Sequence, residues 1–179
     1  MYTLDGNSDH QEVAVARRRG LIVSDKQMQL VDGVLERLRR VSGSKFVALV
    51  STSGQPITTF PPDIHSDTLS LAALAASSFA ATRELAEVLS EREFTLLFHE
   101  GKESNLHVVQ VTDQVLLLLT FGRETQVGRV RLYTSRALEV LKPVFERAED
   151  NGEDPVLVDG EYSREANAAI DGWLADGEK

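Results

Sequence analysis

Two histidines are the residues of this sequence whose type and spacing come nearest to a metal site. His99 and His107 flank a short turn at residues 101–104. If that turn closes a β-hairpin, His99 lies opposite Leu106 and His107 lies opposite Phe98. Residues opposite each other in a hairpin point to the same face of the sheet, and consecutive residues of a strand point to opposite faces. His107 therefore shares a face with Phe98, His99 lies on the other face, and the two imidazoles cannot share one ion. The spacing therefore predicts no metal site.

The other motifs that could support catalysis are incomplete. Ser77 and Ser78 have no base at the spacing of a catalytic triad and no strand-to-helix elbow. The turn Gly101-Lys102-Glu103-Ser104 lacks the upstream glycine and the following helix of a phosphate-binding loop. Glu91 and Glu93 read as surface acids, and the sequence contains no cysteine. We therefore expect no active site and no cofactor in this chain alone.

A long helix predicted at residues 67–89 is the element that would position a binding surface. It contains neither glycine nor proline, and Asp67 is predicted as its N-cap. At 100° per residue, one face forms a core stripe of Leu71, Leu74, Ala75, Ser78, Thr82, Leu85, Ala86 and Leu89. The opposite face carries Leu69, Ala73, Ala76, Ser77 and Ala80, with charge beginning only at Arg83, Glu84 and Glu87. An outer face of small residues favours close contact with another helix or a partner protein, although a helix buried on both sides within its own domain stays open.

The remaining periodicities predict a layered α/β (α+β) protein in the order α-β-β-α-β-β-β-α. Helices are expected at residues 25–41 and 126–145, and strands at 46–50, 55–60, 94–100, 105–111 and 115–121, with a further short strand at 21–23. Pro56 favours an edge position for its strand. The uninterrupted apolar run Val115–Leu119 favours the centre of the sheet. Pro143 is expected to kink or loosen the end of the last helix. The prediction is a five-stranded, mostly antiparallel sheet between helices.

Charge is unevenly distributed along the 179 residues, whose formal net charge is −9. Residues 1–20 hold 3 acids and 3 bases, residues 21–147 hold 15 and 14, and residues 148–179 hold 10 and 2. A nearly neutral domain with an acidic tail argues against nucleic-acid binding, which requires a basic face. No apolar run approaches the length of a membrane span, and no secretory signal is apparent in the first 20 residues, so a cytoplasmic protein is expected.

The two ends are expected to lie outside the folded domain. Residues 1–20 are read as a flexible extension whose Arg17-Arg18-Arg19 run is most simply a solvated cluster. Residues 21–147 form the domain, and residues 148–179 form an acidic linker, at 149–154, followed by a short amphipathic tail. Tyr162, Ile170 and Trp173 lie on one face of that tail at helical spacing, and they are predicted as contacts to a partner.

Three segments resemble the Roadblock/dynein light chain superfamily, and within it the bacterial MglB group. These are the helix at residues 67–86, the segment Phe94…Phe98-His99-Glu100-Gly101, and the stretch Gly128-Arg129-Val130-Arg131-Leu132. Asp159-Gly160-Glu161-Tyr162 is similar to the start of a C-terminal extension found in some members. The resemblance covers residues 21–174 and leaves the first 20 residues outside.

The resemblance implies a homodimer in which edge strands pair across a two-fold axis and the two long helices lie side by side. The edge strand would comprise Thr95, Leu96, Leu97, Phe98 and His99. Proteins of the MglB group bind the GTP form of a Ras-like GTPase, MglA, and accelerate its hydrolysis as two copies per GTPase. They order the catalytic Arg and Gln of the GTPase and insert no arginine of their own. The implied contact face is Leu69, Ala73, Ala76, Ser77, Ala80 and Glu84.

The resemblance therefore predicts a GTPase-activating protein of cell polarity or motility, cytoplasmic and concentrated at a cell pole. Glu84 departs from the family, which often keeps a small residue there. Two other function classes stay open. A scaffold of the same fold would tether a GTPase without activating it, and a small-ligand sensor would need an internal pocket with convergent polar groups.

Overall fold

The computed structural model describes residues 23–62 and 66–150, together with 164–165, 168–169 and 172. Residues 1–20 and the predicted tail contacts Tyr162, Ile170 and Trp173 lie outside the described residues. The element order is that predicted from the sequence. It comprises α1 (Asp25–Ser42), β1 (Phe46–Ser51), β2 (Pro56–Phe60), α2 (Ser66–Val88), β3 (Leu96–His99), β4 (Ser104–Gln110), β5 (Val115–Gly122) and α3 (Val127–Asp150).

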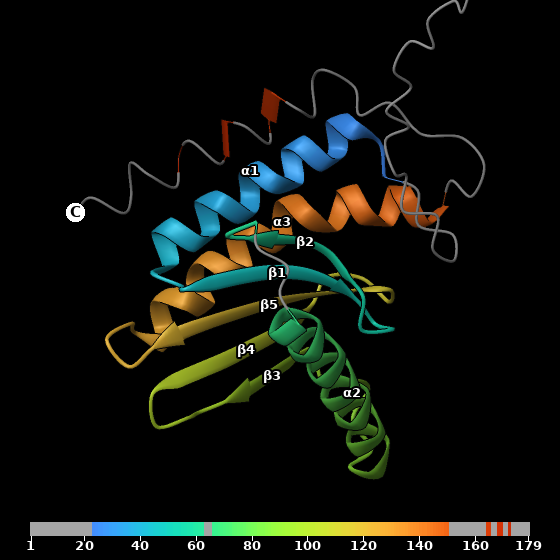
Figure 1. Cartoon of the computed structure of the whole chain (residues 1–179). Coiled ribbons are helices and arrows are strands. Elements are labelled where there is room, and N and C mark those ends of the chain that lie inside the picture. Colours follow the sequence, from blue (N-terminus) through green and yellow to red (C-terminus); the bar gives the residue numbers. More distant parts are fainter. Residues whose placement is uncertain (1–22, 63–65, 151–163, 166–167, 170–171, 173–179) are drawn as a thin grey trace, which may run out of the picture.

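The five strands form one antiparallel sheet in the order β2-β1-β5-β4-β3 (Figure 1). The predicted central position of β5 is confirmed, since all five residues of Val115–Leu119 are buried. The edge position of β2 is confirmed as well. Its Pro56 has no backbone N–H, which an edge strand tolerates because only one of its sides pairs with another strand. In the β3–β4 hairpin, His99 pairs with Leu106 and His107 with Phe98, so the predicted register is correct.

Helices cover both faces of the sheet, and each face has its own apolar core. α1 and α3 pack on one face around Leu38, Leu49, Leu117, Leu141 and Phe145. α2 packs alone on the other face (Figure 1), where its contacts include Val50, Val108, Leu116 and Leu118. The layered sheet between helices is thus confirmed.

Local signals explain where α1 begins and ends. Ser24 caps its start, because its hydroxyl accepts from the Gln27 backbone N–H while the Gln27 side chain accepts from the Ser24 N–H. Gly43 closes the helix at φ +75°, a backbone conformation that glycine adopts without steric cost. Arg39 and Arg40 lie in the last turn, where positive charge complements the helix dipole.

Two predicted helix boundaries and one predicted strand are wrong. α2 begins at Ser66, so Asp67 lies in the first turn and is not the N-cap. α3 continues through Pro143 to Asp150, although the sequence suggested an end at Phe145, because buried side chains such as Val144 and Ala148 anchor the last turns. The expected acidic linker therefore begins inside the helix. Val23 belongs to no strand, and the other two residues of that predicted strand lie outside the described residues.

Candidate protein-interaction surface

α2 rests on the sheet through small side chains and one phenylalanine. Ala72, Ala75, Ala76 and Phe79 are buried against the apolar face of β1, β4 and β5, and Ala86 is buried one helical repeat later. Small side chains let the helix axis come close to the sheet, while Phe79 supplies the one large buried group. Phe79 was not predicted as a core residue, although Ala72, Ala75, Ala76 and Phe79 follow the i, i+3, i+4, i+7 spacing of a buried helix face.

The predicted core stripe of α2 is therefore wrong in part. Leu71, Ala75, Thr82 and Ala86 are buried or half-buried as expected. Leu74, Leu85 and Leu89, however, are 66%, 56% and 63% exposed, and Ser78 is exposed beside them. The buried stripe is turned by about 90° around the helix from the predicted one. Because leucine is more hydrophobic than alanine, the periodicity predicted that the leucines face the core. Here the leucines face away from the sheet of their own chain.

The predicted GTPase-binding face is exposed at five of its six positions. Leu69, Ala73, Ser77, Ala80 and Glu84 are exposed. Ala76 is only 4% exposed, because it packs on the sheet, and it cannot meet a partner as predicted. The Ser77 hydroxyl donates to the Ala73 carbonyl at 2.9 Å, so it is turned back on the helix and presents a compact surface.

A glycine in the β1–β2 turn sets the height of this face above the sheet. Gly54 has φ +82°, and a Cβ placed on it would lie 2.8 Å from the Cα of Ala73. Only glycine allows the turn to approach the backbone of α2 so closely. The exposed side of α2 is consequently placed by a direct backbone contact to the β1–β2 turn.

The C-terminal half of α2 carries a second exposed, apolar surface. With Leu74, the side chains of Leu85, Val88 and Leu89 define what we call the leucine stripe. The helix ends at Val88, and the turn after it contains Ser90 at φ +57°. The Glu91 N–H donates to the Ala86 carbonyl at 2.9 Å, and the Ser90 N–H donates to the Glu87 carbonyl at 3.1 Å. Clustered exposed leucines on a helix of an isolated chain indicate a surface that another chain covers.

The β3 edge belongs to the sheet on which α2 packs, and its Leu97 contacts the core beneath that helix. The Gln110 N–H donates to the Thr95 carbonyl at 3.0 Å. Thr95, just before β3, and Gln110, the last residue of β4, therefore form a hydrogen-bonded pair. Because antiparallel pairs alternate, the backbone groups of Leu96 and Phe98 point away from β4, toward the open edge. No other described strand pairs with that edge, and Leu96 is itself exposed. The predicted edge position of this strand is confirmed, with Thr95 just before its first residue.

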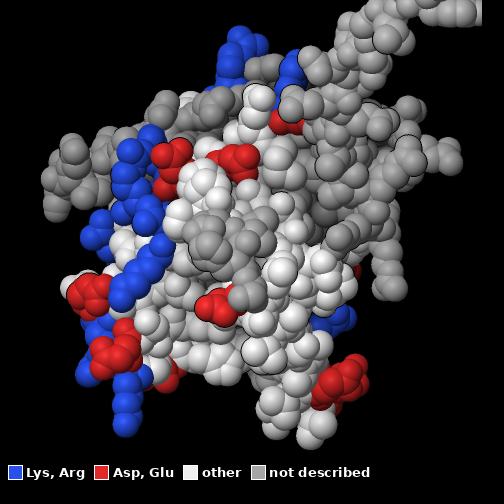
Figure 2. Space-filling view, viewed as in Figure 1, with Lys and Arg blue, Asp and Glu red and all other residues white. Residues whose placement is uncertain are grey.

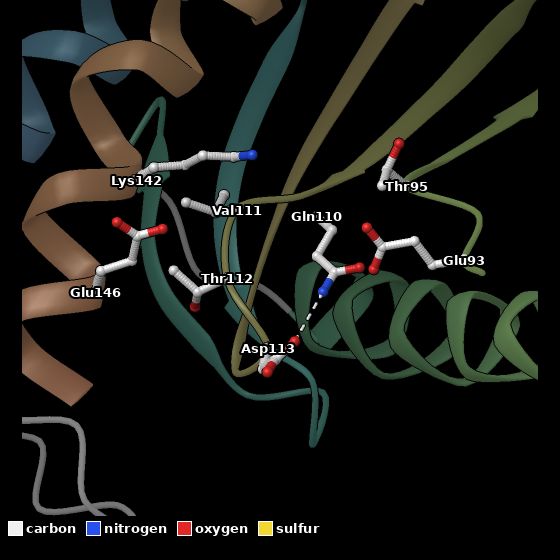
Figure 3. Close-up of a pocket in the computed structure, with 8 residues that line it drawn as sticks. All are labelled: Glu93, Thr95, Gln110, Val111, Thr112, Asp113, Lys142 and Glu146. Atoms are coloured by element: carbon white, nitrogen blue, oxygen red, sulfur yellow. Dashed lines mark hydrogen bonds between the residues drawn. The ribbon is translucent and has the colours of Figure 1, made fainter. Parts of the chain in front are cut away.

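A polar groove of about 250 Å³ opens between the start of β3, the β4–β5 turn and α3 (Figure 3). Glu93, Asp113 and Glu146 line it with a single cation, Lys142, and the Gln110 side chain donates to Asp113 at 3.2 Å. Small-molecule sites usually enclose roughly 300–1,000 Å³ with mostly apolar walls. This groove is smaller, open and lined by charges, so it gives the sensor alternative little support.

His107 is buried beneath α3 and belongs to no site in the described residues. It is 1% exposed, and neither ring nitrogen has a hydrogen-bond partner there. Burial, reinforced by the positive charge of Arg131, lowers the pKa of His107 from 6.5 to about 4, so the imidazole is neutral at physiological pH. Its ring meets Phe98 edge-on at 6.5 Å. His99 projects from the other face of the hairpin, and no described cluster of His, Cys, Asp and Glu could hold a metal ion.

Comparison with known proteins decides the family. The model of the Roadblock/LC7 domain matches residues 30–121, which is just over half of the chain. The chain belongs to the Roadblock/LC7 family. Its match runs from the first half of α1 to the end of β5 and therefore includes α2 and the β3 edge. A comparison with curated proteins gave no match.

Solved structures place this Roadblock/LC7 chain near the MglB proteins. Myxococcus xanthus MglB is 36% identical with a TM-score of 0.61, and the match covers 65% of this chain and 95% of that one. MglB of Thermus thermophilus, described as a gliding protein, is 27% identical with a TM-score of 0.66, over 73% and 98%. A structure described as MglB with tetrameric arrangement is 29% identical with a TM-score of 0.63, over 72% and 96%. The chain is thus an MglB-like member of the family.

None of the described helices of this Roadblock/LC7 chain is long and apolar enough to cross a membrane. The matched structures are covered almost completely, whereas 27–35% of this chain lies outside each match. Family likeness therefore assigns nothing to those additional residues.

Proposed function

We propose that this protein is a homodimeric, MglB-like activator of a Ras-like GTPase of the MglA type. The observation that carries the proposal is the division of α2 into three faces. One face packs on the sheet, a second is the leucine stripe, and a third is the small-residue face of Ala73, Ser77 and Ala80. A single chain buries only the first. The leucine stripe is an exposed apolar patch that a partner would cover, and the small-residue face beside it leaves room for close contact with a second partner.

The leucine stripe is proposed to meet its copy in a second chain. Antiparallel pairing of the β3 edges would bring the two α2 helices together on the same side of a continuous sheet, and it would satisfy the outward backbone groups of Leu96 and Phe98. A two-fold axis makes such a contact self-complementary, because each leucine stripe meets the same stripe.

The small-residue face is proposed to receive the switch region of the GTPase in its GTP form. Two such faces, one from each chain, would form a broad surface without bulky projections. Following the family, the protein would hold the catalytic Arg and Gln of the GTPase in place, a positioning effect that needs no catalytic residue in this chain. Glu84, exposed at the end of this face, would adjust how the partner is oriented.

The proposal extends to the setting of the protein. It would act in the cytoplasm, concentrated at a cell pole, in polarity or motility. Tyr162, Ile170 and Trp173 of the tail would provide a second, tethered contact to the GTPase, which would raise affinity without adding to the chemistry.

One substitution and a matched control test the proposed face. Ala80→Arg places a bulky cation on an exposed position that leaves the sheet contact intact, so binding of the GTP-loaded GTPase should fall at least about tenfold, or 1.4 kcal/mol. Gln29→Arg adds the same side chain to an exposed position of α1 and should leave binding unchanged. Equal affinity of both variants, with both folded, would show that the partner docks elsewhere.

A further inference from the structure

Positive charge is concentrated at one end of a domain that is neutral as a whole. Residues 36–45 and 123–131 hold seven bases and two acids, whereas the rest of residues 21–147 holds seven bases and 13 acids. We call the side chains of Arg39, Arg40, Lys45, Arg123, Arg129 and Arg131 the basic end. Figure 2 shows Lys and Arg gathered along the left side, where α1 ends and α3 begins in Figure 1.

We propose that the basic end is the docking surface for the acidic tail of this chain, residues 151–179. The proposal concerns a contact of the protein with itself and does not depend on the proposed GTPase. The carboxylates of the tail would make the contact, so the aromatic residues of the tail would stay available for a partner.

Side-chain hydrogen bonds to backbone carbonyls tie the segments of the basic end together. The Arg129 Nε donates to the Val41 carbonyl at 2.6 Å, and the Thr125 hydroxyl donates to the Gly43 carbonyl at 3.1 Å. The Arg39 Nε donates to the Lys45 carbonyl at 3.0 Å. Each guanidinium has five N–H donors. Arg39 and Arg129 each use one donor in these hydrogen bonds, so the remaining donors can bind a carboxylate.

The dipole of α1 favours only two of these six charges. Arg39 and Arg40 lie at the C-terminus of α1, where the helix dipole favours cations. Arg129 and Arg131 lie in the first turns of α3, where the dipole disfavours cations, and the first turn contains no acid. The bond from Arg129 to the Val41 carbonyl, at the C-terminus of α1, offsets this cost for Arg129, so Arg131 is the cation that a nearby anion would stabilise most. A carboxylate placed there would interact favourably with both the arginines and the helix end.

The domain supplies few carboxylates to this surface. Lys45 and Glu124 approach to 3.8 Å, with both side chains more than half exposed, so the pair contributes little. Among the described residues, Arg40 and Arg123 have no ion-pair partner. The acids of this chain are instead concentrated after α3, where residues 148–179 hold ten acids and two bases.

The tail is long enough to reach the basic end. α3 has 24 residues and therefore spans about 36 Å, with its first turn at the basic end and its last turn at the other end of the molecule (Figure 1). An extended chain spans up to about 3.4 Å per residue, so residues 151–161 can cover that distance. Glu161 and the four acids that follow it, Glu165, Asp171, Asp176 and Glu178, can then meet the arginines. Tethering keeps their local concentration high.

The test uses the full chain and exploits its lack of cysteine. A nitroxide attached to Ser163→Cys should weaken the NMR signals of backbone amides near it. The proposal requires the tethered tail to occupy its site most of the time, so amides of residues 40–45 and 123–129 should lose more than about half of their intensity at low salt. Raising the salt concentration should restore them, since screening weakens ion pairs between exposed groups.

Charge reversal at the site provides the decisive comparison. Arg40→Glu, Lys45→Glu and Arg123→Glu, combined in one labelled chain, should abolish the loss of intensity. Arg83→Glu, Arg92→Glu and Lys142→Glu change the net charge equally at exposed positions elsewhere and should preserve it. The spectra themselves report whether each variant is folded. Unaffected amides in the parent chain at low salt, or equal loss of the effect in both triple variants, would overturn the proposal. Unaffected amides together with binding to phosphatidylserine vesicles would instead identify the basic end as a membrane-binding surface.

Discussion

Replacing His107 by leucine should make the protein less sensitive to acid. In the folded state the pKa of this buried imidazole falls from 6.5 to about 4. At 1.36 kcal/mol per pH unit, the difference corresponds to about 3 kcal/mol of folding free energy. Between pH 6.5 and 4 the unfolded chain binds a proton that the folded chain does not, so stability falls as the pH falls through this window. About 2.5 kcal/mol should be lost by pH 4.5.

Urea unfolding at pH 7.5 and pH 4.5, at one protein concentration, measures this difference. His107→Leu should lose about 2.5 kcal/mol less than the parent chain between the two conditions, because carboxylate titration is common to both. At pH 7.5 it should be more stable by about 1 kcal/mol, since two buried nitrogen atoms without partners are removed. His99→Leu, at an exposed position, should behave as the parent chain does. An equal loss in the parent chain and His107→Leu would refute the assigned burial.

The remaining predictions concern α2 and the surface arginines. Gly54→Ala should destabilise the fold by about 2 kcal/mol in thermal or urea unfolding, because alanine disfavours the positive φ and its Cβ would meet Ala73. Ser90→Gly should stabilise by about 0.5–1 kcal/mol, because glycine accepts the left-handed conformation that ends α2. Leu85→Glu should convert the dimer to a folded monomer of about 19.7 kDa in light scattering, and a persistent dimer would remove the leucine stripe from the interface. No single Arg→Ala should reduce stimulated GTP hydrolysis by more than about tenfold, unlike the roughly 10³–10⁵ expected of an inserted arginine; the residues to vary are Arg83, Arg92, Arg123, Arg129 and Arg131.

Local patterns were sufficient to predict the sheet. The apolar run of β5 has no polar alternation, and burial on both faces is its only stable position. Pro56 identifies an edge because it cannot donate to a neighbouring strand. The spacing of the β3–β4 turn predicted that His99 pairs with Leu106 and His107 with Phe98, so that the two imidazoles project from opposite faces of the sheet.

The orientation of α2 could not be predicted from the same patterns. Periodicity shows that a helix has distinct faces, but it does not show which face meets the chain's own sheet and which meets another molecule. In α2 the leucines were assigned to the core, whereas the sheet receives Phe79 and the alanines. Ala76 was misplaced for the same reason. The close approach of Gly54 to Ala73 joins turn and helix across the fold and leaves no signal in either local sequence.

The cluster of positive charge could not be predicted either, because its residues come from two segments that are far apart in the sequence. The acidic tail is continuous and could be read directly, whereas the basic end combines residues 36–45 with residues 123–131. Only the antiparallel packing of α1 and α3, joined by the bond from Arg129 to Val41, brings them together. Block counts along the sequence therefore showed a neutral domain where the structure shows separated charge.

Single-turnover GTP hydrolysis by a Ras-like GTPase of the MglA type, with and without this protein, tests the central claim most directly. The proposed function predicts that the hydrolysis rate rises at least about tenfold, equivalent to 1.4 kcal/mol of activation free energy, and that it saturates at two copies of this protein per GTPase. Ala80→Arg should remove the stimulation. An unchanged hydrolysis rate with tight, GTP-dependent binding would contradict activation and identify the protein as a scaffold.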